Sequence, residues 1–287
     1  MYRLFAALLL LVTGAGYSQE ITNSFKYDYT TQHNSGSASF TRHFAQFNYT
    51  QHFAESKLLY TAGVSLYNVE SNRLTTPFNG STIEGITSLK VGVSYLFKIG
   101  GAWEGVASLT PELNTNFEGA GIKDVYPGFF VGVTKTTTGS SPSTLTMGVG
   151  YKGYFGKYRF MPIINYYKKV NEKISYNLGI PATEFAYKLG TRHTLKSIVF
   201  ADAIYTKIGG DNYVNDGLQD NNATKINTLE MLTVNAGLEY NYLSADGWIG
   251  TLKTGYSFYN NLEVNNTNIN FNNSLYISIG FKYNLNF

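Results

Sequence analysis

The last part of the chain alternates between apolar and polar positions. Nearly every even position from 274 to 286 carries a small or polar side chain, whereas the odd positions carry Leu275, Ile277, Ile279, Phe281, Tyr283, Leu285 and Phe287. This period of two residues predicts a β-strand with one apolar and one polar face. In water, the edge of such a long apolar strand would pair with other chains. The pattern therefore favours a strand whose apolar face contacts lipid.

The same alternation recurs along the chain, in segments of roughly 8 to 14 residues that are separated by turn-forming residues. In one such segment, Leu89, Val91 and Val93 alternate with Lys90 and Ser94. The pattern predicts about fourteen strands, or about twelve if the weak segments between 173 and 190 are miscounted. The predicted strands are 23–30, 41–53, 57–68, 85–98, 102–113, 125–135, 144–153, 157–168, 173–180, 184–190, 195–207, 228–242, 247–260 and 274–287.

The links between these segments mostly alternate in length. Counted back from the last strand, long links such as 208–227 alternate with short ones such as 243–246. Long outer loops and short periplasmic turns are typical of outer-membrane barrels. Two links deviate, because 136–143 is long where a short turn is expected and 182–183 is short where a long loop is expected. The alternation still predicts an up-and-down sheet, and closure into a barrel satisfies every strand edge within the membrane.

Composition narrows the class of protein further. Of the 287 residues, 43% are hydrophobic and 16% aromatic, but only 14% are charged, and the mean hydropathy is −0.16. Soluble domains usually contain about 25% charged residues, whereas a transmembrane barrel spreads its apolar residues over alternate positions. The absence of Cys excludes disulfides and thiol chemistry. A net charge of +3, without clusters of Lys and Arg, gives no reason to expect nucleic-acid binding.

The amino-terminal residues have the pattern of a secretory signal peptide. Arg3 precedes a short apolar segment, and the small residues Gly16 and Ser18 come before Gln19. The apolar segment is shorter than the roughly 20 residues that a membrane-spanning helix needs. We therefore expect a signal peptide over 1–18 and one β-barrel domain over 19–287.

Two features resemble known proteins. A final alternating strand that ends on Phe287 is similar to the last strand of bacterial outer-membrane β-barrels, whose terminal aromatic residue is read by the assembly machinery. A central segment resembles a bacterial outer-membrane β-barrel protein family of unknown function. The residues that carry this second resemblance are Met147, Gly148, Gly150, Tyr151, Gly156, Pro162, Tyr166, Leu178, Gly179, Ile180, Pro181, Phe185, Tyr187, Lys188 and Leu189. The resemblance implies a barrel in the outer membrane with no catalytic residues.

Charged residues on the polar face of the predicted strands should point into the barrel. About fourteen strands lie between the roughly eight that side chains fill and the roughly sixteen that leave an aqueous channel. The interior is therefore either filled by paired charges or a narrow pore for small polar solutes with a slight preference for anions. The loop 208–227 is long enough to fold inward and restrict such a pore. The candidate lumen-facing residues are Lys90, Glu104, Glu112, Lys152, Arg159, Lys188, Glu239, Lys253 and Lys282.

One short motif suggests an alternative function. His33 and Ser35 are two residues apart and would share a strand face, as a base and a nucleophile require. This spacing is similar to the His-x-Ser arrangement of outer-membrane phospholipases and lipid A deacylases, so the alternative is a lipid hydrolase. The sequence lacks the Asn that the phospholipase motif has between Ser and Gly, because Gly36 follows Ser35 directly. A polar loop explains the segment better, and we expect no enzyme activity.

Other candidate sites are weaker still. The loop residues Asp211, Asn215, Asp216 and Asp220 offer oxygen ligands for Ca²⁺, but they lack the order of an EF-hand. The histidines show no paired spacing for a metal ion. We therefore expect no cofactor or metal. The expected partners are outer-membrane lipid and lipopolysaccharide, with transient contact to the barrel-assembly machinery through Phe287, and the expected state is a monomer in the bacterial outer membrane.

Overall fold

The structure is a computed structural model of the 287-residue chain. It describes residues 23–33, 38–70, 74–75, 82–118, 120–210, 213–214, 224–269 and 272–285. The expected signal peptide, Ser35, the loop residues proposed for Ca²⁺ and the terminal Phe287 lie outside these ranges. Among the described residues, no helix has the length and apolar character needed to cross a membrane.

Antiparallel strands form nearly all of the described structure. The main sheet has fifteen strands, and because the short β17 lies beside β16 outside the ring, fourteen of them form the wall. The wall strands are β1 (Ser24–Gln32), β2 (Ser39–His52), β3 (Ser56–Glu70), β5 (Thr82–Gly100), β6 (Trp103–Thr115), β7 (Val125–Thr137), β8 (Ser143–Lys152), β9 (Arg159–Lys169), β10 (Ile174–Gly179), β11 (Ala182–Lys188), β12 (His193–Lys207), β15 (Thr228–Leu243), β16 (Trp248–Val264) and β18 (Ser274–Asn284).

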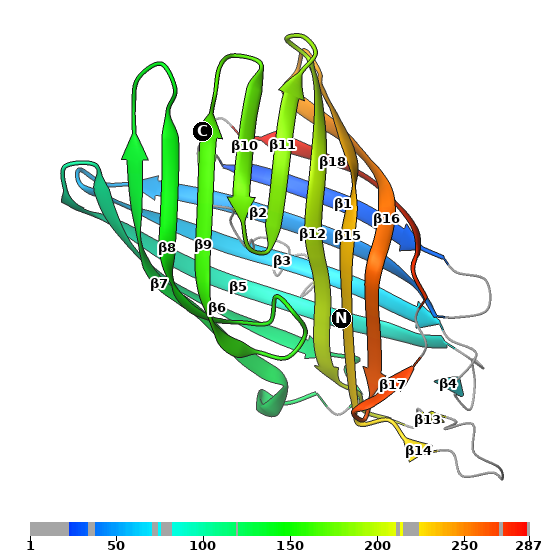
Figure 1. Ribbon diagram of the computed structural model, residues 1–287. Helices are drawn as coiled ribbons and strands as arrows, with labels where there is room; N and C mark the ends of the chain where they lie inside the picture. The colour runs from blue at the N-terminus through cyan, green and yellow to red at the C-terminus, as the bar shows by residue number, and fades with distance from the viewer. Residues whose placement is uncertain are drawn as a thin grey trace.

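The wall is a closed barrel. Each strand pairs with its neighbours in chain order, and β1 pairs with β18 from Ser24 opposite Asn284 to Gln32 opposite Tyr276 (Figure 1). The predicted antiparallel β-barrel is confirmed, and its strand number agrees with the first of the two predicted values. Closure leaves the wall without a free first or last edge, which is the condition for a sheet in hydrocarbon.

Short elements accompany the wall at one end. The strand β17 (Thr267–Ile269) forms a hairpin with β16. A separate three-stranded sheet consists of β4 (Leu74–Thr75), β13 (Tyr213–Val214) and β14 (Thr224–Lys225). A single 3₁₀ turn, η1 (Ile122–Asp124), precedes β7. These elements all lie at the end of the barrel where the longer links are found, which we call the loop end.

The opposite end, the turn end, carries the short links. It includes 53–55 between β2 and β3, 101–102 between β5 and β6, and 244–247 between β15 and β16. The link 138–142 between β7 and β8 also lies at this end, where a short turn was expected. The loop end has one short link, at 180–181 between β10 and β11, rather than at the predicted 182–183.

The two faces of the wall differ as the alternation predicts. On β18, Leu275, Ile277 and Ile279 are 68%, 49% and 59% exposed, whereas Tyr276 and Ser278 are buried. Exposed apolar side chains at alternate positions form an outer surface that suits contact with lipid tails. The other face points into the barrel, where it contacts side chains from other strands.

The wall is incomplete at one place. Strand β10 pairs with β9 only along 165–169, and β11 pairs with β12 only along 194–200. Figure 1 shows the turn between β10 and β11 partway along the longer neighbouring strands. Residues 159–163 of β9 and 202–206 of β12 therefore border a gap in the sheet on the loop side of this hairpin. The gap ends where β12 pairs in parallel with β6, with Lys207 opposite Thr115. We call this gap the notch.

Candidate functional site

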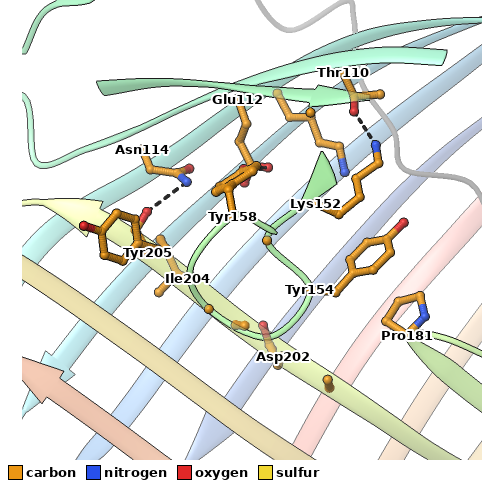
Figure 2. Close-up of a pocket in the computed structure, with 16 residues that line it drawn as sticks. Thr110, Glu112, Asn114, Lys152, Tyr154, Tyr158, Pro181, Asp202, Ile204 and Tyr205 are labelled. Atoms are coloured by element: carbon orange, nitrogen blue, oxygen red, sulfur yellow. Dashed lines mark hydrogen bonds between the residues drawn. The ribbon is translucent and has the colours of Figure 1, made fainter. Parts of the chain in front are cut away.

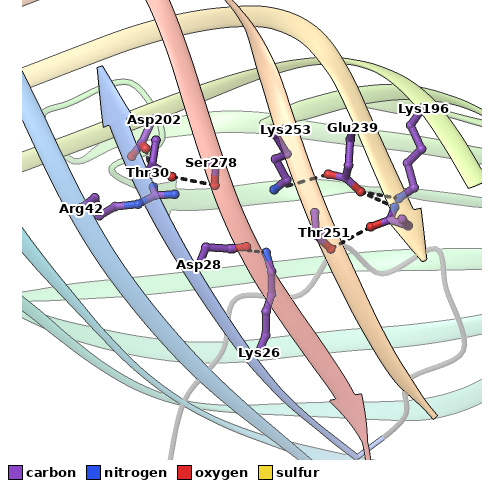
Figure 3. A network of polar contacts seen from close by, with 11 residues as sticks. Lys26, Asp28, Thr30, Arg42, Lys196, Asp202, Glu239, Thr251, Lys253 and Ser278 are labelled. Carbon is purple, nitrogen blue, oxygen red and sulfur yellow. Dashed lines mark hydrogen bonds and ion pairs between the residues drawn. The ribbon is translucent and has the colours of Figure 1, made fainter. Parts of the chain in front are cut away.

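A network of charged side chains lines the barrel interior toward the turn end. The Glu239 carboxylate on β15 forms ion pairs with Lys196 on β12 and with Lys253 on β16, each at 3.4 Å (Figure 3). Lys196 also contacts Glu184 on β11, at 3.1 Å. The network therefore joins four strands, because these side chains all occupy the inner face of the wall.

A second set of polar contacts crosses the lumen. Arg42 on β2 forms an ion pair with Asp202 on β12, and the Tyr67 hydroxyl on β3 donates a hydrogen bond to Asp202 at 3.4 Å. Figure 3 shows Arg42 and Asp202 pointing toward each other, with Lys26 and Asp28 nearby. Lys26 and Asp28 form an ion pair at 2.6 Å. Since β2 and β3 are not neighbours of β12 in the wall, the contacts of Asp202 with Arg42 and Tyr67 tie separate parts of the wall together.

Apolar side chains fill the lumen nearer the loop end. Most of them come from β2, β3 and β5 on one wall and from β12, β15 and β16 on the other, and Ala38, Ile208 and Ile226 lie in the adjoining links. They pack into one buried cluster. We call this cluster the apolar constriction. Its members are Ala38, Phe40, Tyr67, Val69, Ile86, Ile204, Ile208, Ile226, Leu229, Met231, Leu262 and Val264. Several of these side chains have no exposed surface at all, so they pack closely against one another within the lumen.

A pocket of about 170 Å³ lies beside the notch (Figure 2). Its lining includes Lys90, Thr110 and Glu112 from neighbouring strands β5 and β6, together with Lys152 at the end of β8. The Lys152 ammonium donates a hydrogen bond to the Thr110 hydroxyl at 2.5 Å. Glu112 accepts hydrogen bonds at 2.6 Å from Ser88 and from Tyr158.

The link between β8 and β9 borders this pocket. Residues 153–158, which we call the strap, reach across the notch to the far strands. The Lys157 ammonium lies 3.3 Å from Glu230 on β15 and 3.9 Å from Glu263 on β16. The Tyr158 ring stacks on Tyr126 with centroids 4.9 Å apart. Burial and the neighbouring Glu112 carboxylate raise the pKa of Tyr158 far above its usual range, so its phenol stays protonated and keeps its hydrogen bond.

The structure distributes the predicted lumen-facing residues over several places. Lys90, Glu112 and Lys152 lie together at the pocket. Glu239 and Lys253 form part of the charged network. The other four are separate: Glu104 pairs with Lys57 at 3.5 Å, Arg159 donates to the Phe155 carbonyl, Lys188 is exposed, and Lys282 is half-buried on β18 opposite Lys26.

Sequence reasoning did not single out Arg42, Asp202 or Lys196. The segment around β12 mixes apolar and charged residues at even positions, with Lys196 and Asp202 beside Ile198 and Ile204. The structure places all four of these residues on the inner face, where Ile204 joins the apolar constriction. The sequence already showed this mixture of polar and apolar residues on one face of the strand. It can be interpreted only once the lumen is known to be partly apolar.

The proposed catalytic pair is not assembled by the described residues. His33 follows β1 and is exposed, and Ser35 lies outside the described ranges. Within the described residues, no group of three or more His, Cys, Asp or Glu side chains could hold a metal ion.

Comparisons with known proteins concern the family and the fold. Residues 26–284 match a family model described as "Domain of unknown function (DUF6268)". No curated protein matches the sequence. Among solved structures, the COG4313 outer membrane channel from Pseudomonas putida F1 shares 8% identity over 96% of this chain and 100% of that chain, with a TM-score of 0.47.

Two further solved structures are similar over most of the chain. The NanC porin shares 10% identity over 92% of this chain and all of its own, with a TM-score of 0.39. LpxR from Salmonella typhimurium shares 9% identity over 91% of this chain and all of its own, with a TM-score of 0.38. At these identities the likeness concerns the barrel fold alone.

Proposed function

The chain belongs to the DUF6268 family, and from this premise we propose that it is a passive channel for small polar solutes in the bacterial outer membrane. The exposed apolar residues of the wall suit a bilayer, and the barrel resembles those of outer-membrane channels. Since the family carries no assigned activity, the specific role has to come from the lumen.

The charged network around Glu239 carries the proposal. A lumen that served only as structural filling could be apolar throughout, because buried ion pairs are often no more stabilising than well-packed apolar side chains. Here Lys196, Lys253 and Glu239 retain between 12% and 17% side-chain exposure, so water reaches them. Partly hydrated charges on the inner wall provide binding positions for ions and small polar molecules.

The apolar constriction makes this a gated channel. Charged solutes cannot cross a dry apolar contact, because desolvation of an ion costs far more than the protein returns there. Conduction therefore requires the walls that carry Met231 and Leu229 to separate from those that carry Phe40 and Val69. In this proposal, the conformation described here corresponds to the closed state.

Planar-bilayer recording tests the proposal. Refolded protein should give rare, brief openings with a small conductance, and liposomes that contain it should swell in small polar solutes but not in oligosaccharides. The Met231→Ser variant, which weakens the apolar constriction, should open more often. The channel function would be refuted if both folded proteins gave no current and no swelling.

A further inference from the structure

The notch exposes two strand edges at a depth where neighbouring strands are normally paired. Ile164 on β9 still accepts a hydrogen bond from the Ile180 amide, at 3.3 Å, so even-numbered backbone groups of β9 point toward the notch. Pro162, two residues earlier, therefore faces the notch. Because proline has no N–H, the absence of a partner strand here leaves one unpaired backbone donor fewer on this edge.

The opposite edge is covered in another way. The Ala201 amide donates to the Pro181 carbonyl at 3.2 Å, so the odd-numbered backbone groups of β12 point toward the notch. Further along this edge, the Tyr205 carbonyl accepts a hydrogen bond from the side chain of Asn114 on β6 at 3.1 Å (Figure 2). Just beyond this contact β6 itself pairs with β12 in parallel, with Lys207 opposite Thr115. The backbone of Ala203, between the Pro181 and Asn114 contacts, is the part of this edge that faces the notch, where a small molecule can pass between β9 and β12.

The strap closes this passage through contacts that can be released. Its attachment to the far side includes the Lys157 ion pairs with Glu230 and Glu263 and a hydrogen bond from the Lys157 amide to Glu230 at 3.2 Å. The Lys157 ammonium also donates a hydrogen bond to the Asn266 side chain at 3.1 Å. The Lys157 side chain is 50% exposed, so water competes for these pairs. The strap is attached to the wall at Lys152 and Arg159, and it is not part of the sheet.

The pocket behind the strap has two chemical ends. At the inner end, Lys90 and Lys152 provide two ammonium groups, and neither forms an ion pair with a described residue. The Glu112 carboxylate lines the same end, but it accepts its hydrogen bonds from Ser88 and Tyr158. Toward the notch, the lining is mostly aromatic and apolar, with Tyr154, Pro181, Ala201, Ala203, Ile204 and Tyr205. Asp202 is a charged residue on this side, and it forms an ion pair with Arg42. This order of cationic and apolar groups is complementary to an amphiphile with an anionic head.

The size of the pocket also supports binding of the head of an amphiphile, with the tail outside the pocket. About 170 Å³ is smaller than the roughly 300–1,000 Å³ of pockets that enclose drug-sized ligands. The pocket can therefore take a compact head group but not a hydrocarbon tail. On the outer wall beside the notch, Phe160 and Ile164 are 69% and 55% exposed, which gives a tail an apolar surface to follow into the bilayer.

We propose that the pocket between Lys90 and Lys152 binds the anionic head of a single-chain amphiphile, which reaches it from the lipid through the notch when the strap is displaced. This route is lateral, and it bypasses the apolar constriction. It does not depend on axial conduction, because binding at the pocket can be measured without any current.

Binding of radiolabelled decyl sulfate to the protein in nanodiscs of zwitterionic lipid tests the head-group site, after subtraction of binding to empty nanodiscs. Decyl sulfate is anionic at every pH, and decanol is the uncharged ligand with the same tail. The Lys90→Gln/Lys152→Gln variant should bind decyl sulfate at least tenfold more weakly, with no change for decanol. The control Lys98→Gln, at an exposed lysine of the turn end, should bind as the parent does.

Two results would overturn the head-group site. One is an unchanged affinity in the folded double variant, and the other is displacement of decyl sulfate by inorganic sulfate at the same concentration as by unlabelled decyl sulfate, since the tail would then play no part. If the double variant fails to fold, the single Lys90→Gln variant replaces it and should still bind at least threefold more weakly. An unchanged affinity there would also refute the proposal.

A disulfide across the strap tests the lateral route, since the chain has no cysteine of its own. Oxidation of Lys157→Cys/Glu230→Cys, or reaction with a short bis-thiol cross-linker, should slow decyl sulfate association at least tenfold, and reduction should restore it. The control Lys169→Cys/Glu172→Cys replaces an exposed ion pair at the turn end and should show no such dependence. Equal association rates in the locked and reduced proteins would exclude passage beneath the strap.

Discussion

Asp202 on β12 and Arg42 on β2 form an ion pair across the lumen, between strands that are not neighbours in the wall. The Asp202 side chain is only 5% exposed, and it also accepts a hydrogen bond from Tyr67. The pair therefore holds opposite walls together just below the apolar constriction, where a change in the distance between the walls would open or close the lumen.

Removal of one partner should destabilise the barrel strongly. Asp202→Asn leaves the Arg42 guanidinium without its counter-charge, and loss of one partner from a buried pair costs about 3–5 kcal/mol. Urea unfolding in lipid vesicles measures the change in the free energy of unfolding. The double variant Arg42→Met/Asp202→Leu should lose clearly less stability than the single variants Arg42→Met and Asp202→Leu lose together. Additive losses would show that the two side chains do not interact.

Neutralisation of Glu239 should change ion selectivity. Glu239→Gln leaves Lys253 without the carboxylate that it contacts and leaves Lys196 with Glu184 alone. The lumen then has an excess of positive charge, so the reversal potential in a KCl gradient should shift toward the anion value.

The matched control for this change is Glu172→Gln at the turn end. The hydrogen bond from Lys169 lowers the pKa of Glu172, so this carboxylate is charged at neutral pH, but it is fully exposed outside the lumen. Its substitution should leave the reversal potential unchanged. The same shift in both variants would mean that bulk surface charge, and not the lumen network, sets selectivity.

Weakening of the apolar constriction should raise the open probability. Met231 has no exposed surface and lies at the centre of the cluster, so Met231→Ser introduces a hydroxyl and a cavity between the walls. Substitutions that leave such a cavity cost about 2–5 kcal/mol, and this cost falls on the closed state. Single-channel recording should show openings at least tenfold more frequent, whereas Leu275→Ser, on the outer face, should leave them unchanged. If Met231→Ser opened no more often than the parent, the gate would have to lie elsewhere.

The outer face of β18 should tolerate apolar residues and reject charge. Ile279 is 59% exposed on the lipid side, and an arginine near the midplane of a barrel costs about 2–4 kcal/mol. Ile279→Arg should therefore lower the free energy of unfolding by that amount in vesicles, while Ile279→Phe should change it little. A stability of Ile279→Arg equal to that of the parent would contradict contact between this residue and lipid.

The fold follows from the sequence because one rule governs most of the wall. On β18, lipid on one side and polar groups on the other translate directly into alternation, so Leu275 and Ser278 reveal their faces without further information. The strand pairing of an up-and-down barrel then follows chain order. The same rule breaks down on β12, where Ile204 and Asp202 share the inner face because an apolar cluster fills part of the lumen.

The candidate sites were less accessible to sequence reasoning. Lys90, Glu112 and Lys152 could be assigned to the inner face, but their meeting at one pocket depends on the arrangement of β5, β6 and β8 around the notch. The short link at Pro181 was visible as a departure from the alternation of link lengths. Its meaning was not, because a gap in the wall depends on how far β9 and β12 extend beyond the hairpin.

The seam between β1 and β18 has a consequence for biogenesis. The ring is completed by the first and last strands of the wall, from Ser24 opposite Asn284 to Gln32 opposite Tyr276. Contacts so distant along the chain are slow to form, because the intervening segment must be brought together first. Until they form, both strands offer unsatisfied edges to any other polypeptide. A helper that shields β1 and β18 until they meet would therefore decide whether a newly made copy matures or aggregates.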